Sequence, residues 1–289
     1  MPPSFGTSGA PPEPTRLRQI ALVVRDLKKA EQLLTKVLGV EVCFRDPAVA
    51  QWGLENFLLP IGGDIIEVVA PFKEGTTAGR LLEKRGEGGY MIIMQNLNAQ
   101  KRRQYIESKK LSKVIFEHVH DDVTCIQYHP KGIKGGMMPE LDSHAATEAN
   151  PNPLKDRFSP WHACGKDYEH YSRLMRKYGD LHLSSALLRL APGDWDTEGA
   201  SRQWESIFGV GMSRDLVAFT NARMGFVRGQ EGKPEGLDSI TISVNDGARL
   251  DGILQRASDL GLCGDGFVNM CNVKWYFRYA GGGRAPSRL

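Results

Sequence analysis

The sequence predicts an α+β fold in which a βαβββ module occurs four times, paired into two domains. The first observation is that short apolar strands alternate with single helices in a recurring order. The second is that Gly-Gly pairs at 62–63 and 135–136 each precede a short apolar strand that contains a glutamate, Glu67 or Glu140. A carboxylate is costly to bury without a partner. Two of them in equivalent places therefore indicate a repeated module with a site between its copies.

The first module is predicted over residues 17–70. An apolar, β-branched strand at 17–24 leads to Asp26, which has the position of a helix N-cap. Apolar residues then recur at helical spacing as far as Gly39, which has the position of a C′ glycine. Strands follow at 40–44, 51–60 and 64–70.

The second module follows a polar helix predicted at 77–85. It is predicted as a strand at 89–95, a helix at 98–110 and strands at 113–117, 124–129 and 136–141. The third and fourth modules have the same order with less regular patterns, over 181–227 and 239–279.

An Asn- and Pro-rich stretch at 150–158 is the best domain boundary, and a helix at 168–178 is expected to bridge the domains. The predicted organisation has five parts: a disordered leader (1–15), an N-terminal domain (16–145), a linker with the bridging helix (146–180), a C-terminal domain (181–280) and a flexible tail (281–289).

Composition limits the class of protein. The chain has 289 residues and a net charge of +3, with no long basic run, so we expect no nucleic-acid partner. No apolar run approaches the length of about 18 residues that a membrane span requires, so we expect no membrane partner. The five cysteines contain no Cys-x-x-Cys pair, which indicates a reducing compartment without a disulfide framework.

The last three residues, Ser287-Arg288-Leu289, follow a glycine-rich stretch. They are similar to the Ser-Lys-Leu peroxisomal address with Arg in place of Lys. We therefore expect a peroxisomal protein that uses an import receptor if the source is eukaryotic; a chance tripeptide on a cytoplasmic protein is the alternative.

Three stretches together resemble the vicinal oxygen chelate superfamily, which contains glyoxalases, methylmalonyl-CoA epimerases, extradiol dioxygenases and bleomycin-resistance proteins. They are RQIALVVRDLKKAEQLLTKVLGVEV, GGDIIEVVAP and YHPKGIKGGMMPELD. These stretches cover most of residues 17–142, whereas residues 181–280 match in layout more than in motif. The resemblance implies that each pair of modules forms one glyoxalase-like domain, in which a curved mixed sheet forms an open cup. It leaves open whether the protein forms a homodimer.

The resemblance also implies a set of four ligand positions. The first three fall on Gln19, on Glu67 and on Gly89 or Tyr90, where the usual histidine is missing, and the fourth falls on Glu140. Gln19, Glu67 and Glu140 form an oxygen set that suits Mg, Mn or Ca more than Zn. The expected cofactor is therefore none or a weakly held divalent metal.

The function that this resemblance favours is an isomerase or lyase that acts on a small carbonyl-bearing molecule. Glu67 and Glu140 would abstract and return a proton. Gln19, Tyr90, Trp52 and His129 would bind the substrate. The alternative is a protein that sequesters a small molecule without turnover, as bleomycin-resistance proteins do. Extradiol ring cleavage ranks low because neither domain offers two histidines and a glutamate in the required places.

Two other groups have both a chemical and a structural interpretation. Trp161-His162-Ala163-Cys164-Gly165 offers a Cys/His nucleophile or a packed interdomain segment, and we favour the packed segment. His118 and His120 offer a metal pair or a solvated loop, and we favour the loop.

Overall fold

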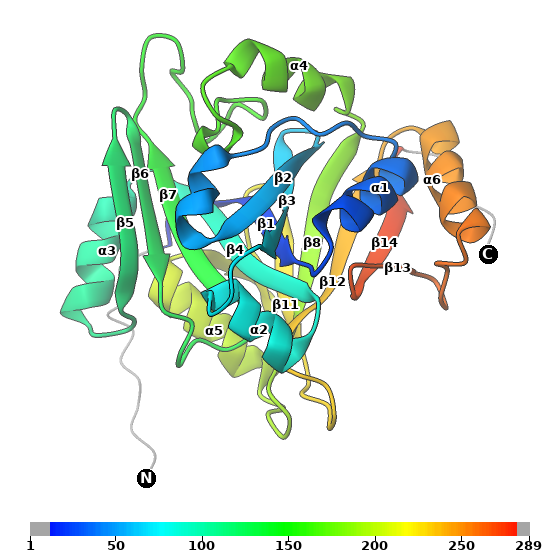
Figure 1. Cartoon of the computed structure of the whole chain (residues 1–289). Helices are drawn as coiled ribbons and strands as arrows, with labels where there is room; N and C mark the ends of the chain where they lie inside the picture. Colours follow the sequence, from blue (N-terminus) through cyan, green and yellow to red (C-terminus); the bar gives the residue numbers. More distant parts are fainter. Residues whose placement is uncertain (1–11, 282–289) are drawn as a thin grey trace.

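Residues 12–281 are described by a computed structural model, in which two seven-stranded mixed sheets lie against each other with helices alongside (Figure 1). The elements of the first half are β1 (Arg16–Val23), α1 (Leu27–Leu38), the 3-10 helix η1 (Pro47–Trp52), β2 (Leu54–Ile61), β3 (Asp64–Pro71), α2 (Thr77–Arg85), β4 (Gly88–Asn96), α3 (Ala99–Ser108), β5 (Val114–His120), β6 (Val123–Tyr128) and β7 (Met138–His144).

The second half repeats this order after a long connection. Its elements are η2 (His162–Cys164), α4 (Tyr168–Lys177), β8 (Leu181–Arg189), α5 (Thr197–Phe208), β9 (Gly211–Ser213), β10 (Leu216–Ala218), β11 (Arg223–Val227), β12 (Gly236–Val244), α6 (Gly247–Asp259), β13 (Val268–Met270) and β14 (Val273–Tyr279).

The two sheets have the same internal symmetry. The first has the strand order β2-β3-β1-β4-β7-β6-β5, and the second has the order β13-β14-β12-β8-β11-β10-β9. In each sheet the two central strands are antiparallel to each other, and each pairs in parallel with the last strand of its own module. The predicted fold class, mixed sheets each made from two modules, is confirmed.

One predicted strand is wrong. Of residues 40–44, only Phe44 pairs as a strand, through an isolated bridge to Leu58. The next predicted strand, from residue 51, begins instead with η1. Pro47 occupies the first turn of this 3-10 helix, and the Asp46 side chain accepts a hydrogen bond from the backbone N–H of Ala48 at 2.9 Å. Both features favour a helical turn over an extended chain.

Helix α1 begins and ends where its sequence predicts. The Asp26 side chain accepts a hydrogen bond from the backbone N–H of Lys29 at 2.9 Å. Gly39 ends the helix with a φ of 65°, a left-handed conformation that glycine adopts without strain.

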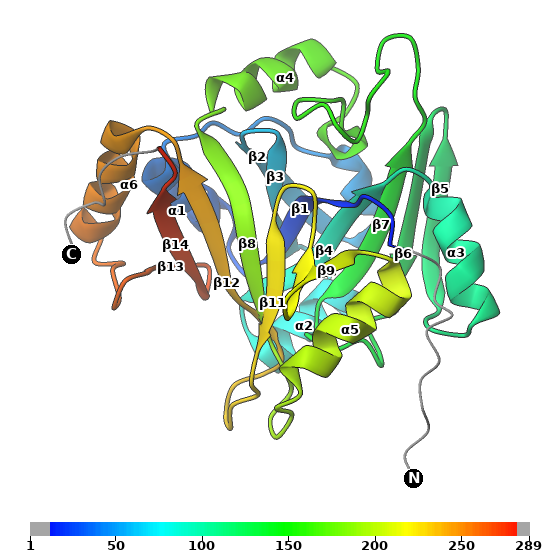
Figure 2. The ribbon, with the colours of Figure 1, turned by 180° about the vertical axis from the view of Figure 1, so that it is seen from behind.

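A single apolar core lies between the sheets. It contains residues of both central strand pairs and of the helices, among them Ile20, Leu22, Leu34, Leu183, Leu188 and Trp204. Helix α1 lies against α6 and α3 against α5, so one helix of each sheet flanks the core at either side (Figures 1 and 2). The opposite, concave face of the first sheet is covered by a separate apolar cluster.

The ends of the chain differ in part from the prediction. Residues 12–15, placed in the leader, are ordered: the backbone N–H of Glu13 donates to the Gly209 carbonyl at 2.9 Å, and Thr15 accepts from Thr220 at 2.8 Å. Residues 1–11 and the Ser287-Arg288-Leu289 tail lie outside the described residues. Among the helices of residues 12–281, none is both long and apolar enough to span a bilayer.

Candidate functional site

Polar side chains form a row across the concave face of the first sheet. Gln19 on β1 pairs with Ile93 on β4, Ile93 pairs with Glu140 on β7, and Glu140 pairs with Gln127 on β6. Residues directly opposite on neighbouring strands share a face of the sheet. Strand pairing therefore places an amide, a carboxyl and a second amide in one line over the sheet.

Glu67 on β3 is buried beside this row and is held by two amides. Its Oε1 accepts a hydrogen bond from Asn56 Nδ2 at 2.6 Å, and its Oε2 accepts one from Gln19 Nε2 at 2.8 Å. Burial raises the pKa of Glu67, and the hydrogen bonds from Asn56 and Gln19 oppose that rise. The carboxylate is thus fixed in position by neutral donors.

The amide of Gln19 is used at both ends. Its Nε2 donates to Glu67, and its Oε1 accepts from the indole Nε1 of Trp161 at 2.8 Å. Both oxygens of Glu67 also accept hydrogen bonds from amides. The set of Gln19, Glu67 and Glu140 predicted as metal ligands would bind a cation only through the remaining lone pairs of these oxygens, and it stays a prediction.

The third ligand position falls on Met91, not on Gly89 or Tyr90. Gln19 pairs with the residue two before Glu67 on β3, and Met91 pairs in the same way with the residue two before Glu140 on β7. The pairing of β1 with β4 contains a register shift, because Ala21 pairs with Met91 and Leu22 with Gly89, so that Tyr90 has no partner on β1. A count of residues along the sequence does not reveal this shift.

Tyr90 lies at this irregularity and is 9% exposed. Burial raises the pKa of Tyr90 to about 12, and the charges of Glu67 and Glu140 add to the rise. The phenol thus stays protonated near neutral pH, as a hydrogen-bond donor within the electrostatic reach of both carboxyl groups.

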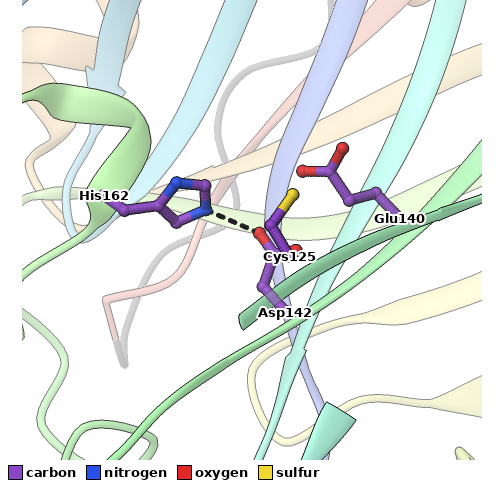
Figure 3. A group of neighbouring side chains, drawn as sticks. All are labelled: Cys125, Glu140, Asp142 and His162. Carbon is purple, nitrogen blue, oxygen red and sulfur yellow. Dashed lines mark hydrogen bonds and ion pairs between the residues drawn. The ribbon is translucent and has the colours of Figure 1, made fainter. Parts of the chain in front are cut away.

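A second polar cluster begins at Glu140. Cys125 of β6, Glu140 and Asp142 of β7 and His162 of η2 each turn one N, O or S atom inward, and these atoms all lie within 4.8 Å of one another. Figure 3 shows the four side chains pointing toward one another. His162 Nε2 and Asp142 Oδ2 are 2.8 Å apart and form a hydrogen bond.

Charges in this cluster are closely spaced and buried. Burial raises the pKa of Glu140 well above its usual value and the charge of Asp142 raises it further, whereas a hydrogen bond from Gln127 Nε2 at 2.7 Å acts in the opposite direction. Burial, with the same two carboxylates nearby, also raises the pKa of the Cys125 thiol.

The sequence interpretation gives Cys125 and Asp142 no role in a site, and it treats His162 only as part of a Cys/His nucleophile, which it ranks below a packed segment. One signal was present: Glu140 and Asp142 are two residues apart on one strand and so share its face. His162 carried no such signal, because its place depends on how a long connection folds back over the sheet.

That connection, residues 158–175, is here called the cover segment. Its side chains Trp161, Cys164, Tyr171 and Met175 are buried in the apolar cluster on the concave face of the first sheet. The packed alternative for 161–165 is therefore confirmed, with the packing made against the first cup.

Buried Arg18 ties the cover segment to β1. It donates to the Ser159 carbonyl at 2.7 Å, and its guanidinium lies 5.2 Å from the ring centroid of Trp161. Burial lowers the pKa of Arg18 to about 9, and the nearby charge of Arg16 contributes to the fall.

The two remaining predicted substrate-binding residues lie elsewhere. Trp52 is 43% exposed and packs edge-to-face on Phe116 of β5, with ring centroids 5.4 Å apart. Since η1 precedes β2, this contact joins elements from opposite edges of the first sheet. His129 is exposed, and its Nδ1 accepts a hydrogen bond from the backbone of Lys131 at 3.0 Å, which accounts for it as a turn residue.

Comparison with solved structures shows that the same fold occurs in another chain of similar extent. Over 92% of this chain and 99% of its own, a hypothetical protein from Staphylococcus aureus superposes with a TM-score of 0.58 at 10% sequence identity. This likeness extends over both sheets and concerns the fold alone. The shared architecture is two mixed sheets, each built from two modules, which is the fold class that the sequence predicts.

Two further similar structures match about half of the chain. A methylmalonyl-CoA epimerase variant from Streptomyces coelicolor, in complex with 2-nitronate-propionyl-CoA, is 22% identical and has a TM-score of 0.41 over 46% of this chain and 99% of its own. The methylmalonyl-CoA epimerase from Mycobacterium tuberculosis is 21% identical, with a TM-score of 0.40 over 45% of this chain and 88% of its own. No family model and no curated protein matches the sequence.

Proposed function

We propose that the protein is an isomerase- or lyase-type enzyme that removes a proton next to a carbonyl group of a small organic molecule, at the concave face of the first sheet. The observation that carries this proposal is the buried carboxylate of Glu67, which two amides hold in one orientation. A general base needs a fixed position and a site shielded from water, and Glu67 has both.

The neighbouring groups can take the other roles. The Tyr90 hydroxyl is a protonated donor that can bind the oxygen on which negative charge develops after proton removal. Glu140 is a second carboxyl group from which a proton can be returned. Gln19 acts as a positioning residue, because it orients Glu67 and does not itself exchange a proton.

Access to Glu67 is proposed through a surface recess of about 310 Å³. The recess is lined in part by Asn56, whose amide donates to Glu67, and by Arg45. Arg45 donates through Nη2 to both carboxylate oxygens of Glu31 at 2.7 Å, so it would bind a carboxylate or phosphate of a substrate only in exchange for that pair.

A second candidate is a binding protein without turnover. It is favoured by the full use of Gln19, whose amide bonds to both Glu67 and Trp161 and so holds the cover segment in the cup instead of contacting a substrate. In this case the same cup would hold a small molecule and would release it unchanged.

The experiment that separates the two is proton exchange in D₂O, followed by NMR over a panel of small 2-oxo acids, 2-hydroxy carbonyl compounds and acyl thioesters. The wild type should exchange the proton next to the carbonyl of at least one compound, and Glu67→Gln should not. Glu74→Gln, at an exposed glutamate after the same strand, is the matched control and should retain exchange. Binding without exchange would overturn the enzymatic proposal, as would full exchange by Glu67→Gln.

A further inference from the structure

We propose that Cys125, Glu140, Asp142 and His162 form a binding site for one transition-metal ion of the zinc type, which fastens the cover segment to the first sheet. This site differs from the predicted set at every position except Glu140. Its existence rests on these four residues alone and not on the proposed reaction.

The geometry of the four donor atoms is close to what an ion requires. Zinc binds its ligands at distances of about 2.0–2.3 Å, so tetrahedral donors lie roughly 3.3–3.8 Å apart. The donor atoms here lie within 4.8 Å of one another before any adjustment. Side-chain rotations that move the donor atoms by about one ångström would bring them to this tetrahedral spacing.

The chemistry of the donors selects the ion. A thiolate, an imidazole and two carboxylates form a mixed set that suits zinc, cobalt or iron, whereas magnesium and calcium prefer oxygen alone. The oxygen set predicted from the sequence suits Mg, Mn or Ca. The cluster of Cys125, Glu140, Asp142 and His162 offers sulfur and nitrogen donors in addition to oxygen.

A buried carboxylate oxygen without a partner is the independent observation. The Asp142 side chain is fully buried, and its Oδ1 has no hydrogen-bond partner. Within residues 12–281, His162 is the one basic side chain that pairs with Asp142, and no Lys or Arg pairs with Glu140. Two buried carboxylates so placed repel each other, and a divalent cation would offset both charges.

Neighbouring groups are arranged as supports for metal ligands. Gln127 donates to one oxygen of Glu140 at 2.7 Å, which fixes the orientation of the carboxyl group. The ring of His162 packs against Trp161 and His144, with centroid distances of 4.8 Å and 5.6 Å. Groups that orient the ligands in this way strengthen metal binding.

The ligands belong to separate parts of the chain. Cys125, Glu140 and Asp142 are on neighbouring sheet strands, whereas His162 follows Trp161 directly in the cover segment. An ion bound to all four would hold Trp161 over Gln19 and would engage Glu140. If the proposed function is correct, the loaded form would therefore be the closed, less active form.

The test is metal binding by the full-length protein after dialysis against a chelator. Zinc chloride, cobalt chloride and magnesium chloride are added separately, the protein is desalted, and the retained metal is measured by mass spectrometry. The wild type should retain about one zinc per chain and no magnesium, and cobalt should produce the intense visible bands of a tetrahedral site with a sulfur-to-metal charge-transfer band.

Cys125→Ser and His162→Gln should each lower zinc affinity by about tenfold or more. Cys263→Ser and His129→Gln, at an exposed cysteine and an exposed histidine, are the matched controls and should bind as the wild type does. Circular dichroism of each metal-free variant checks folding, and Asp142→Asn replaces any variant that fails to fold.

Zinc retention by Cys125→Ser and His162→Gln equal to that of the wild type would overturn the proposal, and so would no retention by the wild type. Because the measurement needs no substrate, its failure leaves the proton-exchange proposal intact. Exchange measured on the chelator-treated protein tests the reaction separately.

Discussion

At the scale of single residues, Gln19 determines how the candidate site is held together. It links the carboxylate of Glu67 to the indole of Trp161, so one side chain connects the sheet to the cover segment. All three groups are buried, and a buried polar group that loses its partner costs more than the bond itself contributed.

Gln19→Leu should therefore lower the free energy of unfolding by about 1–3 kcal/mol, because Trp161 Nε1 is left without an acceptor and Glu67 loses one donor. Urea denaturation followed by circular dichroism measures this loss. Gln51→Leu, at an exposed glutamine of η1, is the control and should change stability little. Equal effects of the two substitutions would remove the linking role of Gln19.

The second prediction at this scale concerns pH. A base must be ionised to act, and burial raises the pKa of Glu67 above the usual value of about 4.3. The rate of proton exchange should thus fall as the pH falls, with a midpoint above that of an exposed glutamate. A pH profile of kcat/KM for an exchanging substrate measures it. A rate that stays constant down to about pH 4 would show that Glu67 is not the base.

At the scale of elements, the sequence allowed prediction of whatever depends on local pattern. Asp26 and Gly39 fix the ends of α1 because their side-chain chemistry and backbone conformation act within one turn. The strand at 40–44 could not be rejected in the same way. Its residues have the β-branched composition of a strand, and only the tertiary pairing of Phe44 with Leu58 shows that a single bridge forms.

In the candidate site, too, local sequence predicted some residues, whereas others depend on tertiary structure. Glu67 and Glu140 were found from the repeated strand pattern, which local sequence expresses. Met91 was missed because a register shift near Tyr90 is a property of the assembled sheet. His162 was missed because it reaches Asp142 across 20 residues of connection.

Gly63 gives a prediction about the turn between β2 and β3. A Cβ at this position would lie 1.8 Å from the backbone oxygen of Arg157 and 2.8 Å from Arg16 Nη2. Gly63→Ala should push the connection away from the sheet and lower the free energy of unfolding by about 1–3 kcal/mol. Thermal denaturation checks this against Gly247→Ala, where the nearest atom to a new Cβ is 3.8 Å away. No loss of stability in Gly63→Ala would mean that the connection packs elsewhere.

At the scale of the whole molecule, the shared core is the dominant feature. The strands of the first sheet lie within residues 16–144 and those of the second within 181–279. Both sheets nevertheless bury apolar side chains, such as Ile20 and Leu183, in one cluster. Each sheet alone would expose that face to water, at a cost proportional to the apolar area uncovered.

We therefore predict that the protein unfolds in one cooperative transition. Differential scanning calorimetry should give a single peak whose calorimetric and van't Hoff enthalpies agree. A fragment of residues 12–145 should aggregate or remain unfolded, because it lacks the second wall of the core. Two separate transitions, or a stable folded fragment, would show that the sheets are energetically independent domains.

Trp161 has one more consequence. Its indole is fully buried on the concave face of the first sheet and donates a hydrogen bond to Gln19. A side chain of the protein itself therefore occupies the space in which a ligand would bind. Trp161→Gly would leave an indole-sized cavity, in which the Gln19 Oε1 atom lacks its hydrogen-bond donor. Free indole should then raise the melting temperature of that variant and leave the wild type unchanged. A cup of this kind can change its specificity by one substitution in the cover, while every strand beneath it stays as it is.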